Sequence, residues 1–243
     1  MTEERLFTGN SPAAVGIVVP ARNEEKLLPA CLRSLATAMD RIELPSTLVL
    51  VLDRCTDRSA ELVEQFRSER SDVRLLQAGE PGVGAARAAG VAALLAEHDP
   101  AGLWIATSDA DSEVPADWLA RQLAYAQAGA DVVLGTVVVT DWSEQPDSVP
   151  RRYLAGYQAE LGHSHLHGAN LSLSAPAYLA AGGFEGVSND EDLGLVRRLE
   201  AIGAAIVRAA DLPVITSARL AGRAPAGFAG HLEKLAELTD AVG

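Results

Sequence analysis

Short apolar runs alternate with amphipathic segments along the first half of the chain. Each run is four to six residues long, which suits a buried strand better than a helix. The predicted strands cover residues 14–19, 47–52, 73–76 and 103–106. The segments between them predict helices, and the first has apolar residues at helical spacing (Leu27, Leu28, Cys31, Leu32 and Leu35). This alternation with short connections predicts a parallel sheet with right-handed crossovers.

The predicted helices of this half differ in how clearly they begin. Glu24 and Glu25 are expected to open the first helix, and Thr56 or Asp57 caps a second that runs to Phe66. The third is rich in alanine and ends near His98.

The second half of the chain predicts a mixed arrangement. A helix over 116–129 and a long strand over 131–140, with Gly135 at a bulge, are followed by a loop over 141–150. Beyond it we expect helices over 151–161, from Pro176 to Gly182, over 192–202 and over 228–238, and strands over 171–174, 205–208 and 213–216. We therefore predict an α/β fold that forms a single domain over residues 1–243, with the loop as the boundary between two halves.

The amino-acid composition and net charge argue against some classes of function. The chain has 243 residues, 48% of them hydrophobic and 22% charged, which is typical of a globular domain. The formal net charge of −13 argues against binding nucleic acid, which needs clustered positive charge. A negatively charged substrate would have to be met locally, by a metal, by arginines or by backbone amides.

Neither targeting nor disulfide formation is indicated. Cys31 and Cys55 form no disulfide framework, and Cys31 is expected to be a buried thiol. The acidic start lacks the features of a signal peptide, and no apolar run approaches the roughly 18 residues of a membrane span. We expect a cytoplasmic protein without a transmembrane segment.

Two carboxylates follow the predicted strand 103–106. Asp109 and Asp111 fall where the strand should end, and ligands of open α/β sheets bind just beyond such ends. Paired aspartates there can hold a divalent cation that neutralises a substrate diphosphate. The alternative is a solvated acidic turn, because an Asp-x-Asp pattern also arises by chance and a second one occurs at Asp190-Glu191-Asp192.

Five motifs together carry a family resemblance. They are VVPARNEE, VLDRCTDRS, GVGAARAAG, SDADS and NDEDLGLVRRLEAIG, in that order over residues 14–217. This set resembles the family-2 glycosyltransferases of the GT-A fold. The resemblance implies a nucleotide-sugar half over residues 14–140 and an acceptor half over 150–243. It also implies an inverting enzyme that needs Mn²⁺ or Mg²⁺ and moves one sugar from a nucleotide-diphosphate sugar, UDP first, to a small-molecule or lipid-linked acceptor.

The resemblance implies roles for residues after the first three strands. The residues matching the nucleotide site are Pro20, Ala21, Arg22, Asn23, Glu24, Asp53, Gly84, Arg87 and Asp109. Asp53 would accept a hydrogen bond from the base, and Arg87 would offer a cation near the diphosphate. The alternative for each is an ordinary polar turn between a strand and a helix. GVGAAR is no dinucleotide fingerprint, because Arg87 replaces the third glycine and the unit is not the first crossover.

The resemblance also places the metal and the catalytic base. Asp111 would ligate the metal, and Asp109 would contact the metal or the ribose; oxygen ligands suit Mn²⁺ or Mg²⁺ better than zinc. Glu191-Asp192 matches the pair whose aspartate removes the proton from the acceptor hydroxyl, opposite the diphosphate. Asp190 leaves the identity of the base open, and a carboxylate that merely favours the helix dipole is the alternative.

Two further groups are assigned by the same resemblance. His167, Gly168 and Asn170 match the acceptor-side strand, whereas zinc binding by His163, His165 and His167 is the less favoured interpretation. Arg219 and Arg223 lie in a loop that could close over the diphosphate or could be plain surface.

Two other functions remain open at this point. A sugar-phosphate nucleotidyltransferase should have a glycine-rich loop after the first strand, where PARNEE stands instead. A non-catalytic nucleotide-sugar-binding protein would keep the fold without needing Asp109, Asp111 and Asp192. The Gln-x-x-Arg-Trp pattern of processive synthases is absent, which favours transfer of a single sugar.

Overall fold

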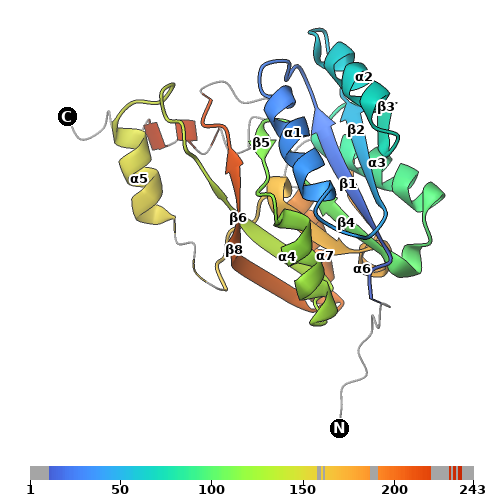
Figure 1. The fold of residues 1–243 in the computed structure, drawn as a ribbon. Helices are drawn as coiled ribbons and strands as arrows, with labels where there is room; N and C mark the ends of the chain where they lie inside the picture. Colours follow the sequence, from blue (N-terminus) through green and yellow to red (C-terminus); the bar gives the residue numbers. More distant parts are fainter. Residues whose placement is uncertain are drawn as a thin grey trace.

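The computed structural model describes residues 11–157, 160, 162–186, 191–219, 230, 232, 233, 235 and 236. An eight-stranded sheet runs through these residues in the order β3-β2-β1-β4-β7-β6-β8-β5 (Figure 1). The strands are β1 (Ala14–Ala21), β2 (Ser46–Leu52), β3 (Val73–Gln77), β4 (Leu103–Thr107), β5 (Ser112–Glu113), β6 (Val132–Val138), β7 (Leu171–Ser174) and β8 (Ile206–Thr216). The helices are α1 (Leu28–Met39), α2 (Ser59–Glu69), α3 (Val83–Glu97), α4 (Trp118–Gln127), α5 (Ser148–Gly156), α6 (Ala175–Ala180) and α7 (Glu191–Ala201).

The first half is the predicted parallel sheet. Strand β1 lies between β2 and β4, and β3 pairs with the outer edge of β2, all in parallel. Alternate residues of β1 enter different cores: Ile17 packs in the cluster that contains α1, α2 and α4, and Val18 packs in the cluster that contains α3, α6 and α7. Helices therefore cover both faces, as a parallel sheet requires.

Strand β7 joins the two halves into one sheet. It runs antiparallel to β4 on one side and to β6 on the other. The mixed α/β arrangement predicted from the sequence is thereby confirmed. Asp109 and Asp111 lie between β4 and β5, at the carboxyl end of β4.

The first helix begins later than predicted. We expected it to open at Glu24–Glu25, but Glu24 precedes a turn, Glu25 is the first residue of that turn, and α1 starts at Leu28. Pro29 occupies the first turn, where its fixed φ and missing N–H are tolerated. The backbone N–H groups of Glu24 and Glu25 donate instead to Ser59 and Asp57, which lie more than thirty residues away in the chain.

The second half departs from prediction in two elements. Helix α5 starts at Ser148, inside the predicted loop 141–150. The predicted strands 205–208 and 213–216 are one strand, β8, whose register against β6 shifts so that Ala209 faces Gly135 and Pro213 faces Thr136. The irregularity does fall at Gly135, but the additional residues are in β8. Most of the predicted helix 228–238 lies outside the described residues; those described within it are helical.

Candidate active site

The loops after β1 and β2 are tied together by side chains. Asn23 and Arg54 both have positive φ, at 56° and 51°, so each loop turns sharply where its strand ends. The Asn23 side-chain oxygen accepts a hydrogen bond from the backbone N–H of Thr56 at 2.7 Å. The Cys55 thiol donates to the carbonyl of Ala21 at 3.3 Å. The two loops therefore form one unit and are not independent turns.

Asp53 links this unit to the start of α3. Its carboxylate is 5% exposed and accepts hydrogen bonds from the backbone N–H of Gly82 and from the Arg54 side chain, both at 3.1 Å. The Arg22 guanidinium is 4.0 Å away and half-exposed. The residues assigned to the nucleotide thus gather around one edge of the sheet, although base binding by Asp53 stays a prediction.

Arg87 is buried between carboxylates. Helix α3 positions it, and its guanidinium donates to Asp109 at 2.5 Å and to Glu191 at close range. Burial alone would lower the pKa of Arg87, but the charges of Asp109, Glu191 and Asp192 outweigh burial and raise it. We expected Arg87 to offer a cation near the diphosphate; in this structure it connects the aspartate after β4 to the first residue of α7.

Gly168 makes room for that arginine. A Cβ atom at Gly168 would lie 2.4 Å from the Arg87 Nη2 atom, so a side chain here would force the buried, ion-paired guanidinium to shift. Thr107, the last residue of β4, donates its hydroxyl to the carbonyl of Gly168 at 2.7 Å and so fixes this backbone. The matched glycine therefore has a packing role, whatever its role toward an acceptor.

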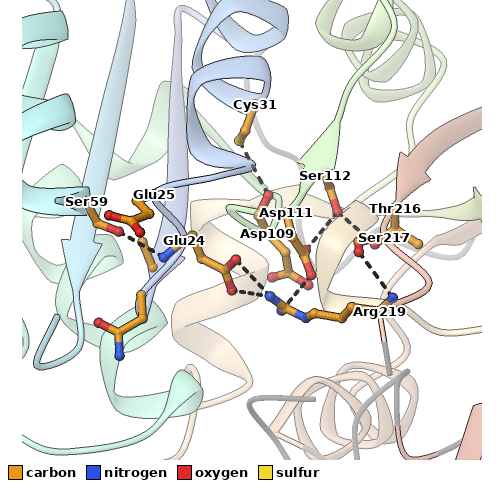
Figure 2. A network of polar contacts seen from close by, with 12 residues as sticks. Glu24, Glu25, Cys31, Ser59, Asp109, Asp111, Ser112, Thr216, Ser217 and Arg219 are labelled. Atoms are coloured by element: carbon orange, nitrogen blue, oxygen red, sulfur yellow. Dashed lines mark hydrogen bonds and ion pairs between the residues drawn. The ribbon is translucent and has the colours of Figure 1, made fainter. Parts of the chain in front are cut away.

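A second arginine, Arg219, holds the carboxylates of Glu24 and Asp111 (Figure 2). Arg219 Nη1 lies 2.7 and 2.8 Å from the two oxygens of Glu24, and Nη2 lies 2.7 Å from Asp111 Oδ2. Burial raises the pKa of Asp111 to about 6; Arg219 counters this rise, whereas Asp109 and Glu24 add to it. No local sequence pattern predicts this contact, since it joins residues from opposite ends of the chain. Arg223, its predicted partner in the loop, lies outside the described residues.

Of the neighbouring carboxylates Glu191 and Asp192, only Glu191 is held by an ion pair among the described residues. Glu191 is 5% exposed and is taken up by Arg87, and Asp190 lies outside the described residues. Asp192 accepts a hydrogen bond from the N–H of Leu193 at 2.8 Å and makes no ion pair with the part of the chain that the structure describes. Burial raises its pKa, and Arg87 and the N–H groups of Leu193 and Gly168 offset this only in part. A carboxyl group with a raised pKa is a better proton acceptor.

Asn170 is a structural residue here. It is 2% exposed, its amide nitrogen donates to the carbonyls of Thr136 and Leu212, and its oxygen accepts from the Trp118 indole at 2.9 Å. Because these bonds occupy the carboxamide and water does not reach it, we no longer expect its side chain to contact an acceptor. A Cβ at Gly135 would overlap this amide, which explains the glycine in β6.

The three histidines stack and do not converge. Rings of His163 and His165 lie 5.6 Å apart and those of His165 and His167 lie 6.0 Å apart, with Tyr157 stacked on His165 at 3.9 Å. Among residues 11–157 and the later described ones, no group of three or more histidine, cysteine or acidic side chains is arranged to hold a metal by itself. The structure therefore does not support the zinc alternative, and a cation at Asp109 and Asp111 needs further ligands from a substrate or solvent.

The acidic edge suits a hard cation on chemical grounds. Carboxylates from Glu24, Asp109, Asp111, Glu191 and Asp192 outnumber the guanidinium groups of Arg87 and Arg219. Oxygen donors of this kind suit Mg²⁺ or Mn²⁺, and a diphosphate ligand would add negative charge that a cation must balance. Asp109 and Asp111 are the residues that could hold such an ion.

Sequence comparison points to one family. Residues 16–176 match the model of glycosyl transferase family 2. An undecaprenyl-phosphate 4-deoxy-4-formamido-L-arabinose transferase of Pectobacterium atrosepticum is 34% identical over 125 residues, which are 51% of this chain and 36% of that protein. The chain thus spans well under half the length of the curated relatives it matches.

Structural comparison agrees with the sequence. A mannosyltransferase of Pyrobaculum calidifontis, in complex with GDP-Man and Mn²⁺, superposes with a TM-score of 0.65 at 18% identity over 88% of this chain and 59% of that one. TarS of S. aureus, in complex with UDP-GlcNAc, gives 0.64 at 17% identity over 93% and 66%. These neighbours establish the fold as GT-A. None of the helices that the structure describes is long and apolar enough to span a bilayer.

Proposed function

Since the chain belongs to glycosyl transferase family 2, we propose that it is an inverting glycosyltransferase that moves one sugar from a nucleotide-diphosphate sugar to an acceptor. One observation carries the proposal: Arg87 joins Asp109, at the end of β4, to Glu191, the neighbour of Asp192. A carboxylate suited to a metal and a carboxylate suited to a base are thereby held at one edge of the sheet. The family favours glycosyl transfer over nucleotidyl transfer.

We place the donor at the unit formed by the loops after β1 and β2. Asp53 and Arg22 would face the base, and the glycines before and within the start of α3 let the backbone approach the nucleotide. UDP is the nucleotide we propose first. Support for a nucleotide-sugar donor comes from two neighbours of this fold, which were solved with UDP-GlcNAc and GDP-Man.

We propose that Asp111 and Asp109 hold Mn²⁺ or Mg²⁺. When bound, the ion would neutralise charge on the departing diphosphate. Support comes from the donor set, which is made of carboxylate oxygens, and from the Mn²⁺ bound to the Pyrobaculum neighbour.

Asp192 is the proposed general base for an acceptor hydroxyl. It would take the hydroxyl proton as the oxygen attacks the anomeric carbon, and help of this kind contributes roughly 10²–10⁴-fold in rate. The curated relatives are named for undecaprenyl-phosphate, and an ionised phosphate oxygen has no proton to remove. An acceptor phosphate would therefore make Asp192 dispensable for proton transfer, so the two acceptor classes can be told apart.

The donor assignment can be tested by thermal shift. UDP, GDP, TDP and CDP are compared with and without Mn²⁺, because a ligand that binds the native state raises the melting temperature. We expect a shift with one nucleotide that is larger with Mn²⁺, and Asp111→Asn should remove the part that depends on Mn²⁺. A chain that no nucleotide stabilises under any condition would contradict the proposal.

The acceptor assignment is tested with Asp192→Asn. If the acceptor is a hydroxyl, this variant should bind donor normally and lose transfer by at least about 10²-fold. If the variant transfers normally to a polyprenyl phosphate, the acceptor is a phosphate and Asp192 is not a base. Normal transfer to a hydroxyl would show that the base is another residue.

A further inference from the structure

Arg219 binds the same carboxylate that we assign to the metal. We call Glu24, Asp111 and Arg219 the Arg219 triad. Its members come from the loop after β1, the turn between β4 and β5, and the segment after β8, and their side chains point toward one another in Figure 2. Glu24 and Asp111 have side-chain exposures of 7% and 14%, so the guanidinium supplies positive charge to acids that water reaches poorly.

The backbone that carries Arg219 is fixed. Thr216, at the end of β8, pairs with Ser112, and their hydroxyls are 3.1 Å apart. The carbonyl of Ala218 accepts a hydrogen bond from Gln145 at 2.7 Å, and its side chain is 4% exposed. Arg219 itself is 20% exposed, so its guanidinium can leave the triad by rotation of its own long side chain.

A divalent cation and a guanidinium compete for Asp111. Both bind carboxylate oxygens, and two positive charges beside one carboxylate repel each other. A cation that binds Asp111 through Oδ2 takes the position of the Arg219 Nη2 atom, which lies 2.7 Å from that oxygen. The displaced guanidinium needs another acid partner, and a diphosphate offers oxygens that arginine binds well.

We propose that Arg219 is a resident counter-ion of the metal site, displaced from Asp111 when the cation and the nucleotide diphosphate bind. The inference rests on the proposed function. It makes opposite predictions for the two ligands: Arg219 weakens binding of the cation alone and strengthens binding of the nucleotide. A residue that only stabilises the fold would weaken or strengthen both together.

The test uses Arg219→Gln and Mn²⁺ alone, with free Mn²⁺ followed by electron paramagnetic resonance. The apparent affinity for Mn²⁺ is proportional to the fraction of molecules whose site is open. If Arg219 occupied the site in nine molecules of ten, the apparent affinity for Mn²⁺ would be about tenfold weaker. We therefore expect Arg219→Gln to bind Mn²⁺ about tenfold more tightly than the unaltered chain. UDP binding at saturating Mn²⁺, measured by calorimetry, should become weaker by roughly tenfold.

Matched variants make the result specific. Arg121→Gln removes an arginine from exposed ion pairs with Asp117 and Asp211, and should leave both affinities unchanged. Arg219→Lys keeps the positive charge but loses the guanidinium fork that reaches two acids. Its Mn²⁺ affinity should therefore lie between those of the unaltered chain and Arg219→Gln. This variant replaces Arg219→Gln in the test if Arg219→Gln folds poorly.

The outcomes separate this inference from the proposed function. Equal or weaker Mn²⁺ binding in both Arg219 variants, with UDP still binding the unaltered chain, would overturn the counter-ion role alone. Binding of neither Mn²⁺ nor any nucleotide diphosphate to any variant would overturn the proposed function as well. Tighter Mn²⁺ binding with weaker UDP binding would support both.

Discussion

Arg87→Met should destabilise the protein strongly. The substitution keeps an apolar stem but is shorter and uncharged, so it leaves Glu191, at 5% exposure, without its partner guanidinium. Removing one member of a buried ion pair typically costs about 3–5 kcal/mol. Asp109 also loses a partner, but at 35% side-chain exposure water solvates it, so it adds less than about 1 kcal/mol. The free energy of unfolding should therefore fall by roughly 3–5 kcal/mol.

Urea unfolding followed by circular dichroism measures this change. With a slope of about 2–3 kcal/mol per molar, the midpoint should fall by about 1–2.5 M with the slope unchanged. Arg121→Met, which breaks only exposed pairs, should shift the midpoint far less than Arg87→Met does. Adding Glu191→Gln to Arg87→Met should restore part of the loss, because the remaining buried group is then neutral. A loss below about 1 kcal/mol in Arg87→Met, or no recovery in the double variant, would refute the reasoning that Arg87 balances buried charge.

Three further predictions concern other parts of the site. Gly168→Ala places a Cβ against the Arg87 guanidinium and should lower the free energy of unfolding in urea by about 1–3 kcal/mol. Gly186→Ala, whose Cβ would meet nothing within 4 Å, should lower it far less. Equal losses would contradict the packing role of Gly168. In native protein a thiol reagent should label Cys55 only, since burial raises the pKa of Cys31 far above its usual range, and labelling of Cys31 before unfolding would contradict this. For a hydroxyl acceptor, kcat/KM should fall as pH drops through the raised pKa of Asp192, because a base must be deprotonated. The midpoint of this fall should lie above a pH of about 4, the ordinary pKa of an aspartate. A midpoint at or below that pH would count against Asp192.

Local patterns predicted the first half of the fold well. Strands β1 to β4 were predicted to within two residues at their ends, because each is a short apolar run between polar turns. The start of α1 was wrong because the relevant hydrogen bonds reach Asp57 and Ser59 from a distant part of the sequence. The single strand β8 was read as two, since its interruption at Asp211 is polar and only pairing with β6 shows that the chain stays in the sheet.

The sequence predicts which residues lie near the candidate site but not which side chains contact one another. Motif order predicted that Asp53, Arg87, Asp109 and Asp192 lie at one edge of the sheet; the contacts agree with that location, and the roles of these residues stay predictions. Nothing in the local sequence shows that Arg219 meets Glu24, because the two are 195 residues apart. Asn170 resembled an acceptor residue by position, but only the surrounding strands and Trp118 show that its amide is fully engaged inside the protein.

The register shift in β8 has a consequence for how this chain tolerates changes in length. Gly135 faces Ala209 and Thr136 faces Pro213, so a chain lacking residues 210–212 would continue the ladder without a break. Those residues instead serve helix α4, through Asp211 contacts with Arg121 and Tyr125, and Asn170, through the carbonyl of Leu212. Insertions or deletions at 210–212 should alter how α4 packs against the sheet while leaving Arg219 in place opposite Asp111. The packing of α4 and the position of Arg219 can therefore change independently of each other.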